Sequence, residues 1–201
     1  MDPVTLKDIK NHKPEKHSLS SGQVLPRPYK YKEARIVFSE MIDGICADMF
    51  SKGLLSSRFT WWASYDWKSL EACPNYEGDV TLDFYGRLHP KHHHGKVRMP
   101  METNSAATIA PLLLQSFDQK TDHRLLFRRL GVVAEGIHED YGFYQMNLFI
   151  DYEALEREKN LQNALSEIRS RFGLNGIFTG KNMLEGATQL ERNGQIGGHK
   201  A

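Results

Sequence analysis

Apolar residues recur along the chain at two different periods, and these periods predict alternating strands and helices. Over 31–52 they return every three or four residues, and Gly53 follows as a C-cap, which predicts an amphipathic helix. The stretch 152–172 has the same period and predicts another long helix. Thr103 or Ser105 can cap a further helix between them.

Four segments rich in alternating or β-favouring residues predict strands. They are 17–26, 58–67, 96–101 and 125–137, with Gly22 expected at a bulge or bend of the first. The residues of the second, RFTWWASYDW, are mostly aromatic or β-favouring. Two helices and four strands therefore alternate through the first two thirds of the chain.

The intervening segment 68–95 is interrupted by repeated proline and glycine, so we expect a long loop or hairpin excursion there. The resulting order is strand, helix, strand, strand, helix, strand. This order predicts an α+β fold in which split βαβ repeats form a four-stranded sheet. The two helices cover one face, the other face stays exposed, and a helical extension follows at the C-terminus.

The same pattern divides the chain into four parts. Residues 1–16 are polar and rich in lysine, which predicts a linker or tail, and 17–138 form the sheet domain. Residues 139–150 are expected to be a hinge with a short peptide motif. The part 151–201 is expected to hold a helix and a loose, glycine-rich tail.

Composition places the chain among ordinary globular proteins. Hydrophobic residues make up 40% and charged residues 25% of its 201 residues. No apolar run is long enough to cross a bilayer, and the first residues lack the apolar stretch of a secretory signal. We therefore expect a cytoplasmic protein that has no membrane partner.

Charge is segregated along the chain although the formal net charge is only +1. Acidic residues crowd the segments 66–83 and 135–158, whereas basic residues dominate between them. Such segregation can produce one basic face on a nearly neutral protein, and the local field attracts phosphates more than the net charge does. The basic residues are Arg87, Lys91, Lys96, Arg98, Arg124, Arg128 and Arg129.

The cluster HPKHHHG raises the alternative of a zinc-dependent enzyme. Consecutive histidines do not suit tetrahedral closure around zinc, and no cysteine is near, so we predict no metal site and favour a basic hairpin. Asp79 and Asp83 are interpreted as solvated acids of a loop. No catalytic residues are assigned.

The order and spacing of several motifs resemble the little-finger domain of Y-family translesion DNA polymerases of the ImpB/MucB/SamB and UmuC type. The motifs are KHSLSSGQVL, YEGDVTLDFYGRLHPKHHHGKVRMPMETNS, FRRLGVVAEGI, QMNLF, IRSRFGLNGIFTG and ERNGQIGGHKA. The resemblance implies the C-terminal part of a bacterial DNA-directed DNA polymerase that acts in DNA repair. The catalytic palm domain would precede this region together with the fingers and thumb, so the chain alone is expected to be no enzyme and to hold no cofactor. The full polymerase would use Mg.

The resemblance also implies that this domain lies across the major groove of the primer-template duplex and holds its backbone without reading sequence. Because neighbouring strand residues point to opposite faces, Arg128 and Arg129 cannot share one flat surface unless a bulge or strand edge intervenes, and one of them can be a structural salt-bridge residue. The alternative for each basic position is a solvated surface side chain. The positions carried over as DNA-binding are Ser18, Ser20, Lys96, Arg98, Thr103, Ser105, Arg128 and Arg129.

The peptide QMNLF resembles the bacterial sliding-clamp-binding pentapeptide. The resemblance assigns clamp contacts to Gln145, Met146, Leu148 and Phe149, with Leu148 and Phe149 as apolar anchors. The alternative is that these side chains pack into the core of the domain. An alternative function also stays open, in which a non-catalytic interaction protein competes for the clamp without useful affinity for DNA.

Overall fold

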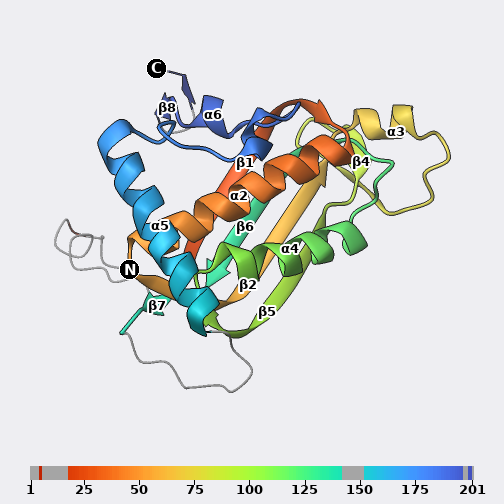
Figure 1. Ribbon diagram of the computed structural model, residues 1–201. Coiled ribbons are helices and arrows are strands. Elements are labelled where there is room, and N and C mark those ends of the chain that lie inside the picture. Colours follow the sequence, from red (N-terminus) through yellow and green to blue (C-terminus); the bar gives the residue numbers. More distant parts are fainter. Residues whose placement is uncertain (1–4, 6–17, 142–151, 197–198, 201) are drawn as a thin grey trace.

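The computed structural model describes residues 5, 18–141, 152–196 and 199–200, and it shows a mixed α+β protein built on one main sheet (Figure 1). The strand order is β1-β6-β2-β5, every neighbouring pair is antiparallel, and a short fifth strand, β7, pairs with β2. The α+β class predicted from the sequence is confirmed. The strands are β1 (Ser18–Tyr29), β2 (Leu54–Tyr65), β5 (His93–Thr103), β6 (Phe127–Glu135) and β7 (His138–Glu139).

Two helices, α2 (Tyr31–Ser51) and α4 (Ala106–Lys120), lie side by side on one face of this sheet (Figure 1). The helix α5 (Tyr152–Phe172) packs against α2. All three were predicted, because each has a long apolar stripe. The predicted cap of α4 is Ser105, whose hydroxyl accepts a hydrogen bond from the Thr108 amide at 3.2 Å.

The hydrophobic core lies between the sheet and the helices, and strict alternation along the strands builds it. On β2, the side chains of Phe59, Trp61 and Ala63 point toward α2 and α4 and are fully buried. Burying a large apolar side chain contributes about 1.5–3 kcal/mol, so these positions fix which face of each strand turns inward. None of the helices in the described residues covers the opposite face.

The first strand differs from its prediction at both of its irregular points. Gly22 was expected at a bulge or bend, and it forms no bulge, because it stays in regular register opposite Gly131. The register shift falls instead between Val24 and Tyr29, a stretch that contains Pro26 and Pro28. Proline has no amide hydrogen to donate to the ladder, and the shift lets β1 continue past both prolines instead of closing there.

The predicted excursion after β2 contains its own secondary structure. A short helix, α3 (Lys68–Ala72), leads into the hairpin of β3 (Val80–Leu82) and β4 (Leu88–Pro90). The Asp83 carboxylate closes the hairpin turn by accepting hydrogen bonds from the backbone amides of Tyr85 and Arg87, at 2.8 and 2.9 Å.

The residues just before the predicted glycine-rich tail are attached to α2. Glu40 of α2 is only 2% exposed and accepts hydrogen bonds from the amides of Thr188 and Gln189, at 2.8 and 3.2 Å. No helix within the described residues is long and apolar enough to cross a membrane. The remaining elements are the 3-10 helix η1 (Gly180–Met183), α6 (Gln189–Arg192), β8 (Gln195–Ile196) and β9 (His199–Lys200).

Candidate nucleic-acid interface

The sheet face opposite α2 and α4, called here the open face, carries polar and cationic side chains. The antiparallel register aligns these residues in rows that run across β1, β6, β2 and β5. Six residues of β2 separate the first row from the fourth, so the face extends for about 20 Å along the strands. The rows are Ser18, Glu135, Arg58 and Arg98, then Ser20, Val133, Thr60 and Lys96, then Gly22, Gly131, Trp62 and His94, and finally Val24, Arg129 and Ser64.

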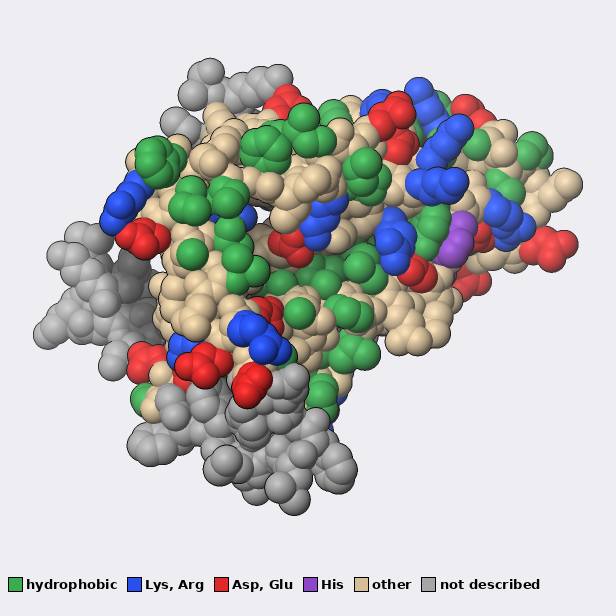
Figure 2. Space-filling model, viewed as in Figure 1, with side chains coloured by type: hydrophobic (Ala, Val, Ile, Leu, Met, Phe, Trp, Pro, Cys, Tyr) green, Lys and Arg blue, Asp and Glu red, His purple; other side chains and the backbone are tan. Residues whose placement is uncertain are grey.

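Four cations of the open face are exposed, and the salt bridges of the described residues include none of them. Cations elsewhere are commonly paired, and Figure 2 shows Lys and Arg interspersed with Asp and Glu on the helix-bearing side. The open face therefore keeps positive charge available for an anionic ligand. The four residues are Arg58, Lys96, Arg98 and Arg129.

The arrangement of charge in the first row is unfavourable by itself. Arg58 and Arg98 lie directly opposite each other on β2 and β5, and like charges in such a pair destabilise a sheet. Glu135 lies opposite Arg58 on β6, and its carboxylate accepts a hydrogen bond from the Thr60 hydroxyl at 2.7 Å. One carboxylate offsets part of the repulsion, and an anion bound across the row would offset the rest.

Trp62 occupies the middle of the open face. Its indole lies over Gly131 of β6, where a Cβ atom would collide with the ring, and Gly131 is buried as a result. A Cβ atom at Gly22, one strand further, would lie 3.9 Å from Trp62 Cζ2. The absence of side chains at both glycines thus lets the indole lie across the sheet toward β1.

Five of the DNA-binding positions predicted from the sequence share the open face. Ser18, Ser20, Lys96, Arg98 and Arg129 are all exposed there, on three different strands. Their hydroxyl, ammonium and guanidinium groups are the usual donors to phosphate oxygens. The structure therefore brings together residues that lie more than a hundred positions apart in the chain.

Arg128 lies elsewhere, as expected for the neighbour of Arg129. Its guanidinium donates a hydrogen bond to the carbonyl of Leu25 at 2.7 Å and lies 3.8 Å from the Asp66 carboxylate. These contacts hold the irregular end of β1 against β6. Arg128 thus has the structural role that strand alternation allowed for one of the two arginines.

Thr103 and Ser105 are also separate from the open face. Both are buried, and the Thr103 hydroxyl accepts a hydrogen bond from the Ser105 amide at 3.0 Å. The Ser105 hydroxyl caps α4 and donates to the Glu158 carboxylate of α5 at 2.6 Å. Their hydroxyls are engaged within the protein, and we leave both residues out of the interface.

Four open-face residues were missed at the sequence level, namely Arg58, Thr60, Trp62 and His94. The adjacent Trp61 and Trp62 could have predicted one of these positions. Neighbouring strand residues point to opposite faces, so only one of the two tryptophans can lie in the core. The predicted clamp-binding residues Gln145, Met146, Leu148 and Phe149 lie outside the described residues.

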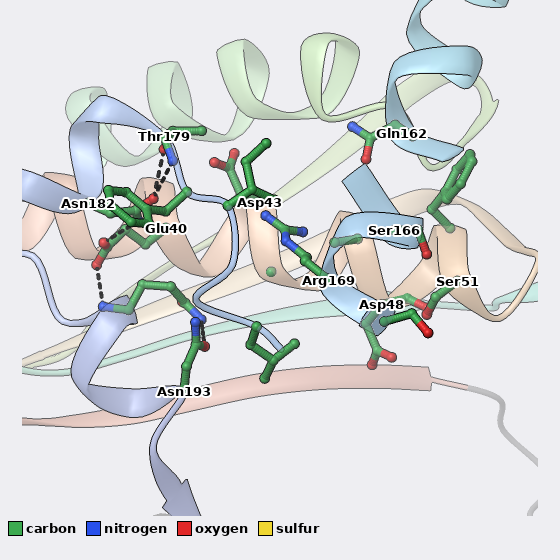
Figure 3. Close-up of a pocket in the computed structure, with 18 residues that line it drawn as sticks. Glu40, Asp43, Asp48, Ser51, Gln162, Ser166, Arg169, Thr179, Asn182 and Asn193 are labelled. Carbon is green, nitrogen blue, oxygen red and sulfur yellow. Dashed lines mark hydrogen bonds between the residues drawn. The ribbon is translucent and has the colours of Figure 1, made fainter. Parts of the chain in front are cut away.

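A cavity of about 510 Å³ lies on the other side of the molecule, between α2, α5 and the C-terminal segment (Figure 3). Figure 3 shows Arg169 projecting from α5 into this cavity. The acidic residues at its wall have internal partners, since Asp43 pairs with Lys181 at 2.5 Å and Glu40 accepts from Asn182 at 2.6 Å. We assign no reaction to this cavity.

The histidine cluster does not gather into a metal site in the described ranges. Alternation on β5 turns His93 toward the helices and His94 toward the open face. Among the described residues, no group of three or more His, Cys, Asp or Glu side chains could hold a metal ion.

No family model matches the chain, and no curated protein matches it.

Proposed function

We propose that the open face binds the phosphate backbone of DNA without reading its sequence. The observation that carries this proposal is the set of four exposed cations on one sheet face, none of which forms a salt bridge within the described residues, joined by Ser18 and Ser20. Backbone phosphates supply the anion that this arrangement favours, and the four adjacent strands are wider than the helix or two-stranded ribbon that the major groove admits.

The strand connections support the proposed architecture of the little-finger type. β6 lies between β1 and β2, which are joined through α2, and β2 lies between β5 and β6, which are joined through α4. We propose that these are two split βαβ units, which put both helices on one face and leave the other free for DNA. In this proposal the chain is the C-terminal part of a bacterial translesion polymerase, and residues 145–149 recruit the sliding clamp.

The proposal assigns no catalytic step to this chain. Its partners are the primer-template backbone, the sliding clamp and the preceding palm, fingers and thumb domains of the polymerase. Phosphoryl transfer and its Mg²⁺ would belong to the palm. The contribution of this chain is to hold DNA by contacts that are indifferent to sequence and therefore tolerate movement of the duplex along the face.

A salt series tests the proposal. The full chain is titrated with a 20-base-pair duplex at several salt concentrations, and affinity is expected to fall about tenfold or more from low to physiological salt. The double variant Lys96→Ala with Arg98→Ala should weaken binding and reduce the slope of log affinity against log salt by about one for each phosphate that is no longer neutralised. Two duplexes of equal composition and scrambled sequence should bind equally.

A matched control removes the same charge elsewhere. Lys52 and Arg124 are also exposed cations, but they lie off the open face and pair with Asp48 and Asp122 at 2.8 and 2.7 Å. The double variant Lys52→Ala with Arg124→Ala should therefore retain the wild-type salt slope. Equally weakened binding in both double variants, or binding that ignores salt, would contradict the proposal. A chain that binds the clamp but not DNA would favour the alternative interaction protein.

A further inference from the structure

Trp62 is the one tryptophan, tyrosine or phenylalanine in the aligned rows of the open face. Its neighbour Trp61 shows the ordinary arrangement. Trp61 is fully buried, packs against Phe117 with ring centroids 5.2 Å apart, and donates from Nε1 to the Ser116 hydroxyl at 3.0 Å. Trp62 points the opposite way and stays partly exposed.

One side of the Trp62 indole lies against the backbone at Gly131, and the residue stays partly exposed. The supporting side is Gly131, which the ring buries. Among the described residues, the aromatic and cation–π contacts involve other rings, such as Trp67 beneath Arg87, and Trp62 takes part in none of them. The result is a flat apolar platform in the centre of a cationic surface.

The cations lie around this platform at distances that the register sets. Lys96 is one row away on β5, and Arg129 is one row away in the other direction on β6. Neighbouring rows are two residues apart, or about 7 Å along the strands. A ligand that stacks on the indole would thus have positive charge on both sides of the stacked group.

Double-stranded DNA does not explain the platform. In a duplex the bases are stacked on one another, so only their edges and the phosphates are accessible, and neither needs an aromatic plane. An unpaired nucleotide offers both groups that the surface can bind, a flat base for the indole and flanking phosphates for the cations.

We propose that Trp62 stacks on an unpaired base of single-stranded DNA whose flanking phosphates contact Lys96 and Arg129. This inference rests on the proposed function, because it uses the same cations, and it adds a single-stranded substrate and a second kind of contact. The alternative is that the indole only covers the sheet at Gly131. A leucine could also cover the glycine, but it offers no π face, and this difference makes the two interpretations separable.

The test compares two probes of equal charge on the full chain. One is a twelve-nucleotide oligothymidylate, and the other is an oligonucleotide of the same length in which every site is abasic. The wild-type chain should bind the oligothymidylate about tenfold more tightly than the abasic strand, since the abasic strand has no base to stack on the indole. Binding should quench part of the tryptophan fluorescence, and the quenching should be absent in Trp62→Leu.

Three variants and a duplex separate the roles. In Trp62→Leu the preference for bases over abasic sites should disappear while duplex binding and its salt slope stay at the wild-type level, and Trp62→Phe should retain part of the preference. Lys96→Ala with Arg98→Ala should weaken binding of both single-stranded probes. Melting temperatures identify any variant that fails to fold, and the two-probe comparison on the wild type needs no variant.

The outcomes distinguish failure of the stacking site from failure of the proposed duplex binding. Equal affinity of the wild type for the two probes, or a full preference in Trp62→Leu, overturns the stacking site while salt-dependent duplex binding still supports the proposed function. A chain that binds neither duplex nor single strand overturns both. A tenfold preference that vanishes in Trp62→Leu supports stacking, and loss of duplex binding in the same variant would instead show a merely structural role.

Discussion

At the scale of single residues, polar groups that look unremarkable in the sequence are organised by contacts between strands and loops. The Tyr65 hydroxyl accepts a hydrogen bond from the Asp122 amide at 3.0 Å and lies 2.8 Å from His93 Nδ1. In the arrangement that satisfies both groups, the hydroxyl donates its proton to an unprotonated Nδ1, and the ring proton of a neutral His93 is on Nε2.

We predict that protonation of His93 destabilises the protein. Burial lowers the pKa of His93, so the unfolded chain binds this proton more readily than the folded chain does. The stabilising contribution is complete above the ordinary histidine value of about 6.5 and is lost as pH falls through the lower folded pKa. The free energy of unfolding should therefore decrease between pH 7 and pH 5, and His93→Gln should show a smaller decrease.

Two measurements check whether protonation of His93 lowers the free energy of unfolding. Denaturant unfolding at each pH gives the difference in slope between wild type and His93→Gln, and an NMR titration of the ring gives the folded pKa directly. An unchanged slope in the variant, or a His93 ring that titrates above about 6.5, would contradict the prediction.

At the scale of elements, sequence periodicity was sufficient for the three long helices but not for the short helices α3, η1 and α6. α2 and α5 were predicted within one residue of their ends, because each has many apolar positions at one period. The bulge of β1 was misplaced, because its position depends on how the segment that contains Pro26 and Pro28 pairs with β6. The residues of β6 lie about a hundred positions further along the chain.

The candidate interface was predictable only in part for the same reason. Lys96 and Arg98 stand out in the sequence as an alternating basic pair, and alternation alone puts them on one face. Arg58 and Trp62 could not be assigned to the interface without the register of β2 with β6, which puts them beside Glu135 and Gly131. No local pattern contains this register.

We predict that Glu40 is the main attachment of the C-terminal segment to α2. It is buried and accepts hydrogen bonds from Asn182 and from the amides of Thr188 and Gln189, so truncation leaves buried donors unpaired. Glu40→Ala should lower the free energy of unfolding by about 3 kcal/mol, measured by denaturant unfolding. Hydrogen exchange at the amides of Thr188 and Gln189 should also accelerate, since the segment loosens locally.

A carboxylate on the same helix provides the control for this prediction. Asp48 forms an exposed salt bridge with Lys52 four residues later, and pairs of this kind are worth about 0.3–0.5 kcal/mol. Asp48→Ala should therefore have little effect on unfolding or on exchange at Thr188. If Glu40→Ala behaved like Asp48→Ala, the C-terminal segment would have to be held by other contacts.

At the scale of the whole molecule, the sheet separates two surfaces with different chemistry. The cations of the open face lie on one side, whereas α2, α4, α5 and the C-terminal segment lie on the other (Figure 1). The chain is fixed to the sheet just before the proposed clamp peptide, because β7 pairs with β2 and the Asp140 amide donates to the Gly53 carbonyl at 2.7 Å. It rejoins the described structure at α5. The peptide is thus flanked by two elements of the described structure, β7 and α5.

The last prediction is that residues 145–149 bind the bacterial sliding clamp while the sheet domain remains folded without their contribution. Leu148 and Phe149 are adjacent and would concentrate apolar contact area in one pocket of the clamp. Truncation of both to alanine should cost about 2–4 kcal/mol and largely abolish a micromolar interaction, measured by calorimetric titration of the clamp. The melting temperature should stay nearly unchanged.

The matched control truncates one leucine and one phenylalanine at exposed positions of α5. Leu161 and Phe172 are 58% and 74% exposed, so Leu161→Ala with Phe172→Ala removes the same apolar atoms from the surface and should leave clamp affinity intact. Core residues would behave differently, because truncation of a buried leucine or phenylalanine typically costs about 2–5 kcal/mol of stability. Clamp binding retained by Leu148→Ala with Phe149→Ala would remove the clamp assignment, and unfolding of that variant would show that both side chains belong to the core.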